Sequence, residues 1–143
     1  MGSIIAIPKL LQEQIFRNAV RAYPNECCGL LLGEIEGQLK LVRKVWESEN
    51  VTESGRHNRY CISPFELLKA ENFVAKRGWE VLGVYHSHPD HSARPSEFDR
   101  THAILHYSYV ILSVIRGRPG ESGCWTLGDW DSSFEPEELR ITD

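Results

Sequence analysis

The pattern of apolar and polar residues, together with helix-start signals, predicts three helices in this chain. In the first, Leu11, Ile15 and Ala19 stand four residues apart and share one face, and Pro24 would end the helix. The second follows the sequence Ser63–Glu66, which has the form of a capping box with proline at the first helical position. The predicted helices span residues 9–22, residues 64–77, and a segment that begins at residue 96.

Short apolar runs between these helices predict strands. The run GLLLG is typical of a buried strand, and the run that ends in histidine is mostly apolar before it. The predicted strands span residues 29–33, 39–46, 59–63, 81–88, 107–115 and 124–127, and the polar segments 47–58 and 116–123 are expected to be a loop and a turn region. The resulting order, α-β-β-β-α-β-α-β-β, predicts an α/β (α+β) fold with helices packed on a mixed sheet.

Composition narrows the class of protein. With 143 residues, one domain over 1–143 is expected, with a core at about 4–128 and a poorly patterned acidic tail at 129–143. Apolar residues make up 41% and charged residues 25%, as in ordinary soluble globular proteins. The net charge of -4 argues against a nucleic-acid partner, which would favour a basic stripe.

The expected location is the cytoplasm. The N-terminal segment has no basic region before its apolar run, so neither a signal peptide nor a membrane span is expected. The four cysteines form no Cys-x-x-Cys pair, and a cytosolic protein would keep these thiols reduced.

Two histidines at the end of a predicted strand suggest a metal site. His86 and His88 are separated by one residue, so their side chains point to the same face of the strand and can converge on one ion. The alternative for this pair alone is two surface histidines.

Two carboxylates complete this candidate site. Asp99 follows His88 by eleven positions, at a predicted helix start, from which it can face the strand end. Two histidines and an aspartate leave one tetrahedral position open, as in catalytic zinc sites. A helix cap formed with Ser96 is the alternative for Asp99. Glu26 stands beside a very apolar segment and is a candidate base, with an exposed loop acid as the alternative.

In combination, these residues resemble a known family. Glu26, then His86-Ser87-His88, then seven residues, Ser96, two residues and Asp99 fill every position of the signature of the JAMM (MPN+) metalloproteases. The flanking strings ECCGLLLG and GVYHSHP also look familial, and the resemblance extends from about Pro24 to Leu127.

The resemblance implies a role for each residue. His86, His88 and Asp99 would bind one Zn²⁺ per chain, Glu26 would be the general acid and base, and Ser96 would help to hold the oxyanion. The implied fold is the MPN fold, a curved mixed sheet flanked by helices and related to cytidine deaminases. Inactive relatives lose these residues, so their presence favours an active enzyme.

The resemblance also implies a substrate class. JAMM enzymes cleave after the C-terminus of ubiquitin or ubiquitin-like proteins, and this chain is similar to the small stand-alone prokaryotic members. These are associated with ubiquitin-like (β-grasp) sulfur carriers that end in Gly-Gly, so hydrolysis of the bond after Gly-Gly is expected. The alternatives are an isopeptidase acting on ubiquitin-like conjugates and a non-catalytic module that binds a ubiquitin-like protein. A zinc deaminase would need His-x-Glu and Pro-Cys-x-x-Cys, which this sequence lacks.

Overall fold

The structure is a computed structural model that describes residues 3–143, so Met1 and Gly2, part of the segment expected to lack a signal peptide, lie outside the described residues. The strands are β1 (Ile4–Pro8), β2 (Cys28–Glu36), β3 (Leu39–Ser48), β4 (Glu80–Pro89), β5 (Ser108–Ile115), β6 (Arg118–Thr126) and β7 (Glu135–Thr142), and the helices are α1 (Lys9–Ala22), α2 (Pro64–Ala75) and α3 (Glu97–Thr101). Among these helices, none combines the length and apolar character that a membrane crossing requires.

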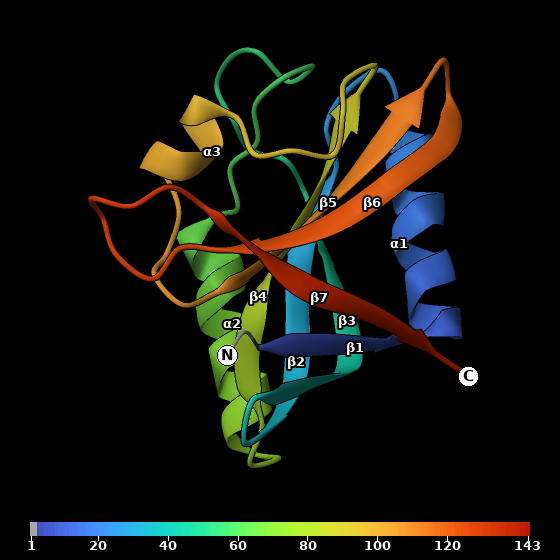
Figure 1. The fold of residues 1–143 in the computed structure, drawn as a ribbon. Coiled ribbons are helices and arrows are strands. Elements are labelled where there is room, and N and C mark those ends of the chain that lie inside the picture. Colours follow the sequence, from blue (N-terminus) through green and yellow to red (C-terminus); the bar gives the residue numbers. More distant parts are fainter. Residues whose placement is uncertain (1–2) are drawn as a thin grey trace.

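The strands form a closed mixed barrel in the order β1-β3-β2-β4-β5-β6-β7. β1 runs parallel to both β3 and β7, and β4 runs parallel to β5, while the other neighbours are antiparallel. Figure 1 shows α1 and α2 on opposite sides of the central strands β2 and β4. The sheet therefore has an apolar layer on each face.

The leucines of β2 divide between these two layers. Leu30 and Leu32 pack with α2, whereas Leu31 packs in the cluster that contains Ile15 and Ala19 of α1. Because both faces of β2 are buried, its sequence is continuously apolar rather than alternating. The helix predicted at 9–22 is confirmed, with Ile15 and Ala19 buried as its spacing requires.

Both ends of the described chain contain strands that the sequence did not predict. β1 pairs with β7, with Ile4 opposite Glu138, and β7 occupies the segment expected to be a poorly patterned tail. Glu137 of β7 is buried, where its carboxylate accepts from the Ser108 hydroxyl and lies 3.3 Å from Lys40 Nζ. Because an acid occupies the buried position of β7, the alternation of apolar and polar residues that would identify this strand is hidden.

Two further predictions of secondary structure are wrong. Residues 59–63 form no strand, because the Asn50 side chain bonds the backbone there: its amide donates to Arg59 O at 3.0 Å and its oxygen accepts from Cys61 N at 3.1 Å. The predicted turn at 116–123 is also too long, since the turn lies at Arg116–Gly117 and β6 begins at the next residue.

The capping box expected at the start of α2 is incomplete. The Ser63 hydroxyl accepts from Phe65 N, but Glu66 does not return the bond, and instead accepts from Trp46 Nε1 at 3.2 Å. A complete capping box is found at the start of α3, between Ser96 and Asp99.

Candidate metal centre

The end of β4 presents two histidines on one face. His86 is fully buried and His88 is 7% exposed, so neither is a surface histidine. Ser87, between them, points to the other face, where its hydroxyl accepts from Cys27 N at 2.8 Å. This bond joins β4 to the residue that follows Glu26.

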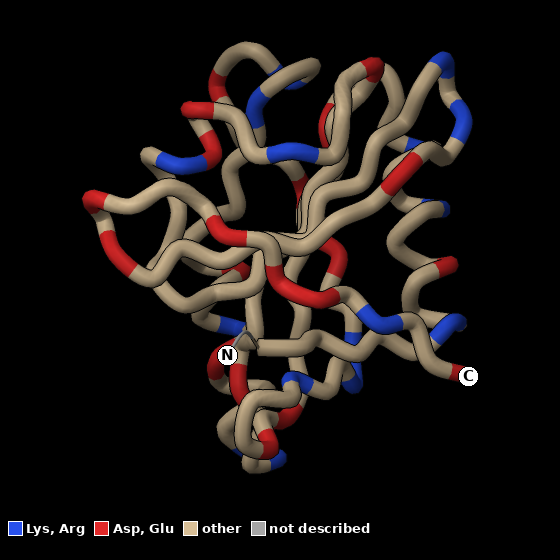
Figure 2. Tube along the Cα trace, in the orientation of Figure 1, with Lys and Arg blue, Asp and Glu red and all other residues tan. Residues whose placement is uncertain are grey.

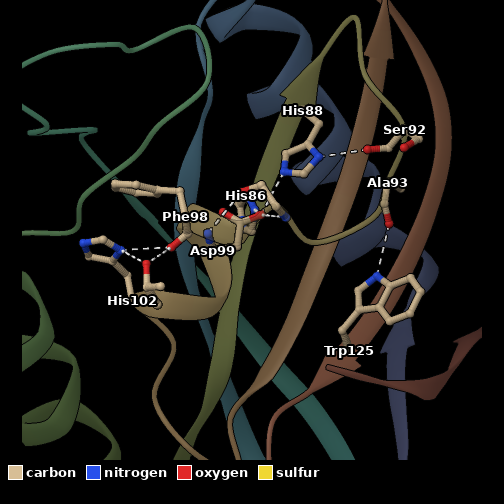
Figure 3. A network of polar contacts seen from close by, with 10 residues as sticks. His86, His88, Ser92, Ala93, Phe98, Asp99, His102 and Trp125 are labelled. Carbon is tan, nitrogen blue, oxygen red and sulfur yellow. Dashed lines mark hydrogen bonds and ion pairs between the residues drawn. The ribbon is translucent and has the colours of Figure 1, made fainter. Parts of the chain in front are cut away.

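Asp99, in the first turn of α3, faces both imidazoles. Its Oδ2 lies 3.2 Å from His86 Nε2 and 3.1 Å from His88 Nε2. The three candidate ligand atoms all lie within 4.8 Å of one another, and all three residues are buried (Figure 3). The structure therefore brings together the three residues predicted to bind the metal.

Hydrogen bonds outside this cluster fix its orientation. His88 Nδ1 lies 2.8 Å from the carbonyl oxygen of Ser92, so with a proton on Nδ1 the Nε2 lone pair faces Asp99. Asp99 Oδ2 also accepts from Ser96 N at 2.9 Å, and the Ser96 hydroxyl accepts from Asp99 N at 3.0 Å. Asp99 is thus both the cap partner and the third member of the cluster, so the two interpretations of this residue are compatible.

His86 is held by stacking rather than by hydrogen bonds. The ring of Tyr60 stacks on it, with centroids 4.4 Å apart. Nδ1 of His86 has no hydrogen-bond partner among residues 3–143, and Nε2 has only the 3.2 Å contact with Asp99 Oδ2, which does not meet the geometry of a hydrogen bond. Buried ring nitrogens that lack a hydrogen bond are rare unless a ligand satisfies them. Two imidazoles and one carboxylate form a donor set that fits Zn²⁺ and leaves a fourth position open, so these residues fit the metal that the resemblance implies.

Glu26 lies just before β2 and is buried, with 3% of its surface exposed. Its backbone N donates to Arg56 O at 2.7 Å, while its side-chain Oε1 has no partner among the described residues. Glu26, His88 and Ser96 line one cleft of about 420 Å³. The two residues predicted to be catalytic therefore open onto the same space as a predicted metal ligand.

Burial and charge set the protonation states of this site. Burial, and then the Asp99 carboxylate, raise the pKa of Glu26 to about 9, so Glu26 holds a proton at neutral pH unless a cation lies nearby. Burial lowers the pKa of His86 and keeps the imidazole in its neutral, metal-binding form. Burial alone would raise the pKa of Asp99. The neighbouring His86, and the hydrogen bonds that the Asp99 carboxylate accepts, have a larger effect in the opposite direction, so the pKa of Asp99 is lowered.

Sequence reasoning missed several residues around this centre. Tyr60 lies in the segment 59–63 that is predicted to be a strand, and no pattern in the sequence marks it as the residue that stacks on His86. The backbone carbonyl groups of Ser92 and Ala93 could not be identified from side-chain patterns either. The Ser92 carbonyl contacts His88, and the Ala93 carbonyl accepts from Trp125 Nε1 at 3.1 Å, which holds the loop in place (Figure 3).

Two curated relatives match most of this chain. A protein of Thermus thermophilus described as a probable TtuB-protein conjugate cleaving protease is 34% identical over 113 residues, which are 79% of this chain and 72% of the relative. A desampylase of Haloferax volcanii is 29% identical over 119 residues, 82% of this chain and 78% of the relative.

Solved structures agree with the expected fold. A protein of Desulfitobacterium hafniense superposes with a TM-score of 0.85 at 30% identity, covering 97% of this chain and 93% of that one. A JAB1/MPN domain protein of Archaeoglobus fulgidus, at 19% identity and a TM-score of 0.59 over 100% and 98% of the two chains, shares the fold. The predicted MPN fold, with a mixed sheet and flanking helices, is confirmed. Since the family described as prokaryotic homologs of the JAB domain also matches residues 8–128, this chain belongs to that family.

Proposed function

We propose that this chain is a zinc-dependent peptidase that hydrolyses the bond after the C-terminal Gly-Gly of a small ubiquitin-like (β-grasp) sulfur carrier. The observation that carries the proposal is the cluster of His86, His88 and Asp99, of which His88 lines the same cleft as the buried residue Glu26. Metal ligands and a partnerless acid beside an open cleft are the parts that metal-assisted hydrolysis needs.

In this proposal His86, His88 and Asp99 hold the zinc. When bound, zinc supplies Lewis-acid activation of water and of the substrate carbonyl. The Ser92 carbonyl and the Ser96 backbone N–H keep the ligand atoms of His88 and Asp99 directed toward each other.

Glu26 moves the proton. Amide hydrolysis adds the hydroxyl of water to the carbonyl carbon and needs a proton on the leaving nitrogen, and one carboxylate can take that proton from water and deliver it. The raised pKa of Glu26 favours the delivery, while a nearby cation would lower this pKa and so favour the uptake.

Ser96 stabilises the oxygen of the attacked carbonyl. Its hydroxyl oxygen accepts from Asp99 N, so the hydroxyl hydrogen stays free to donate into the cleft that Ser96 lines. A donor held in place by a helix cap needs no rearrangement when charge develops on the carbonyl oxygen.

The substrate class rests on similarity. One relative is described as acting on TtuB-protein conjugates and another is named a desampylase, and JAMM enzymes act after the C-terminus of ubiquitin-like proteins. Glycine at the two positions before the cut would let the substrate backbone approach the cleft walls closely, because it has no Cβ.

The test uses the purified chain with its metal and a β-grasp carrier that ends in Gly-Gly plus one further residue. We expect mass spectrometry to show one cut, immediately after Gly-Gly, and no cut in a Gly-Gly→Ala-Ala carrier or in casein. Glu26→Gln is the matched control, since it keeps the zinc ligands and should not cut. Equal cutting of both carriers would refute the specificity, whereas carrier binding without cleavage would indicate a non-catalytic module.

A further inference from the structure

The cleft beside the candidate metal centre carries two arginines as well as the residues used above. Arg59 and Arg94 line the same space as Glu26, His88 and Ser96. Arg59 lies in the loop between β3 and α2, and Arg94 in the loop between β4 and α3. Figure 2 shows basic segments in both loops, which lie at the same end of the molecule. The chain as a whole is acidic, so this placement gives the cleft a charge opposite to the net charge.

Arg59 is held in place by an aromatic ring. Its guanidinium lies 4.9 Å from the centroid of the Phe98 ring, and Phe98 in turn stacks on His102 with centroids 4.0 Å apart. A guanidinium that rests on an aromatic face keeps its N–H groups free for a second partner in the ring plane.

Neither arginine has an acidic partner in the part of the chain that the structure describes. The arginines that do form ion pairs, Arg21, Arg43, Arg100 and Arg140, each contact a glutamate on the outer surface. The two acids of the site have other roles: Asp99 contacts the histidines, and Glu26 is the proposed proton carrier. The pair at the cleft is therefore available to an anionic group of a ligand.

We propose that Arg59 and Arg94 bind the free α-carboxylate of the residue that leaves when the carrier is cut, so that the substrate is a linear C-terminal extension. This inference rests on the proposed function and specifies its leaving group. Arginine binds carboxylates through paired, charge-assisted hydrogen bonds, which the planar guanidinium presents in a fixed geometry.

The direction of the substrate follows from Glu26. In hydrolysis the C–N bond breaks, the hydroxyl of water joins the glycine carbonyl, and the leaving nitrogen receives the proton that Glu26 delivers. The leaving residue therefore lies next to Glu26, inside the cleft that Arg59 and Arg94 also line. One residue spans roughly 3.5 Å, so the carboxylate of a short extension stays within this cleft. A lysine joined through its side chain has its own carboxyl in a peptide bond and offers no such group.

The experiment compares two carriers that differ in one group. One ends in Gly-Gly-Ala with a free carboxylate and the other in Gly-Gly-Ala-amide, and each is given to the zinc-loaded wild type, Arg59→Gln, Arg94→Gln and Arg17→Gln. Arg17 is an exposed arginine of α1 outside the cleft and serves as the matched control. We expect the wild type to prefer the free acid by roughly tenfold or more in kcat/KM. Each cleft variant should lose roughly ten- to a hundredfold on the acid, mainly through KM, and little on the amide.

A third carrier, Gly-Gly-Asp-amide, distinguishes the terminal carboxylate from an acidic side chain. If this carrier is cut as well as the free acid, the arginines bind a side chain and the terminal assignment is overturned. Equal cutting of acid and amide by the wild type, with unchanged arginine variants, refutes the inference while the proposed function stands. Failure to cut any carrier overturns both. Binding of the two Gly-Gly-Ala carriers to Glu26→Gln, which should not cut them, gives a second measurement and should also favour the acid.

Discussion

Replacing Ser96 by alanine separates two consequences of one hydroxyl. Its oxygen accepts from Asp99 N at 3.0 Å and caps α3, while its hydrogen is free to donate to a substrate oxygen in the cleft. Loss of the cap alone costs about 1 kcal/mol of stability. For a chain of this length, that cost corresponds to a fall in Tm of roughly 2–5 °C.

The catalytic consequence is larger and is measured separately. Loss of one oxyanion donor lowers kcat by roughly a hundred- to a thousandfold. We therefore expect Ser96→Ala to melt slightly earlier and to lose kcat by that factor, with little change in KM. Ser63→Ala is the matched control, because the Ser63 hydroxyl caps α2 by accepting from Phe65 N at 3.2 Å but does not line the cleft. It should show the same loss of Tm and an unchanged kcat.

Zinc content, measured on the same samples, completes the comparison. Since the cap also holds Asp99, a fall in kcat that matches a fall in bound zinc would mean that Ser96 acts only by positioning the ligand. An unchanged kcat in Ser96→Ala with full zinc content would refute the oxyanion role. Ser96→Thr keeps the hydroxyl and should recover most of the rate.

The remaining predictions test the ligands, the base and two buried bonds. Elemental analysis should give about one zinc per chain, and zinc that persists after both His86 and His88 are replaced by alanine would contradict the assignment. Glu26→Gln should keep its zinc but lose at least about a hundredfold in turnover, and near-normal kinetics would mean that another group carries the proton. Ser87→Ala should lower the unfolding free energy in urea titrations by about 1–3 kcal/mol, because it leaves a buried backbone N–H without its acceptor; an unchanged midpoint would argue against this. Burial of Glu137 is outweighed by the hydrogen bonds and the lysine beside it, which lower its pKa from 4.5, so ionised Glu137 stabilises the fold above that pH and this contribution is lost as pH falls. Between pH 7 and pH 3, the free energy of unfolding should therefore fall more steeply in the wild type than in Glu137→Gln. Parallel curves for the two proteins would refute this role of Glu137.

The candidate site was predictable mainly because Glu26, His86, His88, Ser96 and Asp99 together resemble the JAMM signature. Local patterns contribute less: in a strand, a period of two places His86 and His88 on one face, and a serine three residues before an aspartate marks a helix start. What the sequence left undecided was whether Asp99 caps or faces the histidines, since that depends on how the loop between β4 and α3 returns to the strand. The structure shows that the same oxygen does both.

The parts of the fold that were missed depend on contacts between distant residues. β1 and β7 stabilise each other by parallel pairing, and no local pattern in either one records its partner. The alternation of Tyr60 and Ile62 favours a strand, and both side chains do pack against the apolar cluster between β2 and α2. They reach it from a loop, however, because the backbone between them donates to the Asn50 side chain. Periodicity reports which side chains are buried, and it does not report what satisfies the backbone.

The pairing of β1 with β7 has a consequence for biosynthesis. β1 and β7 lie near opposite ends of the sequence, since Ile4 of β1 is opposite Glu138 of β7. β1 therefore leaves the ribosome well before β7. Until β7 has emerged and paired, one side of β1 exposes N–H and C=O groups that can pair with other nascent chains. The barrel therefore closes late, when the last strand pairs with the first.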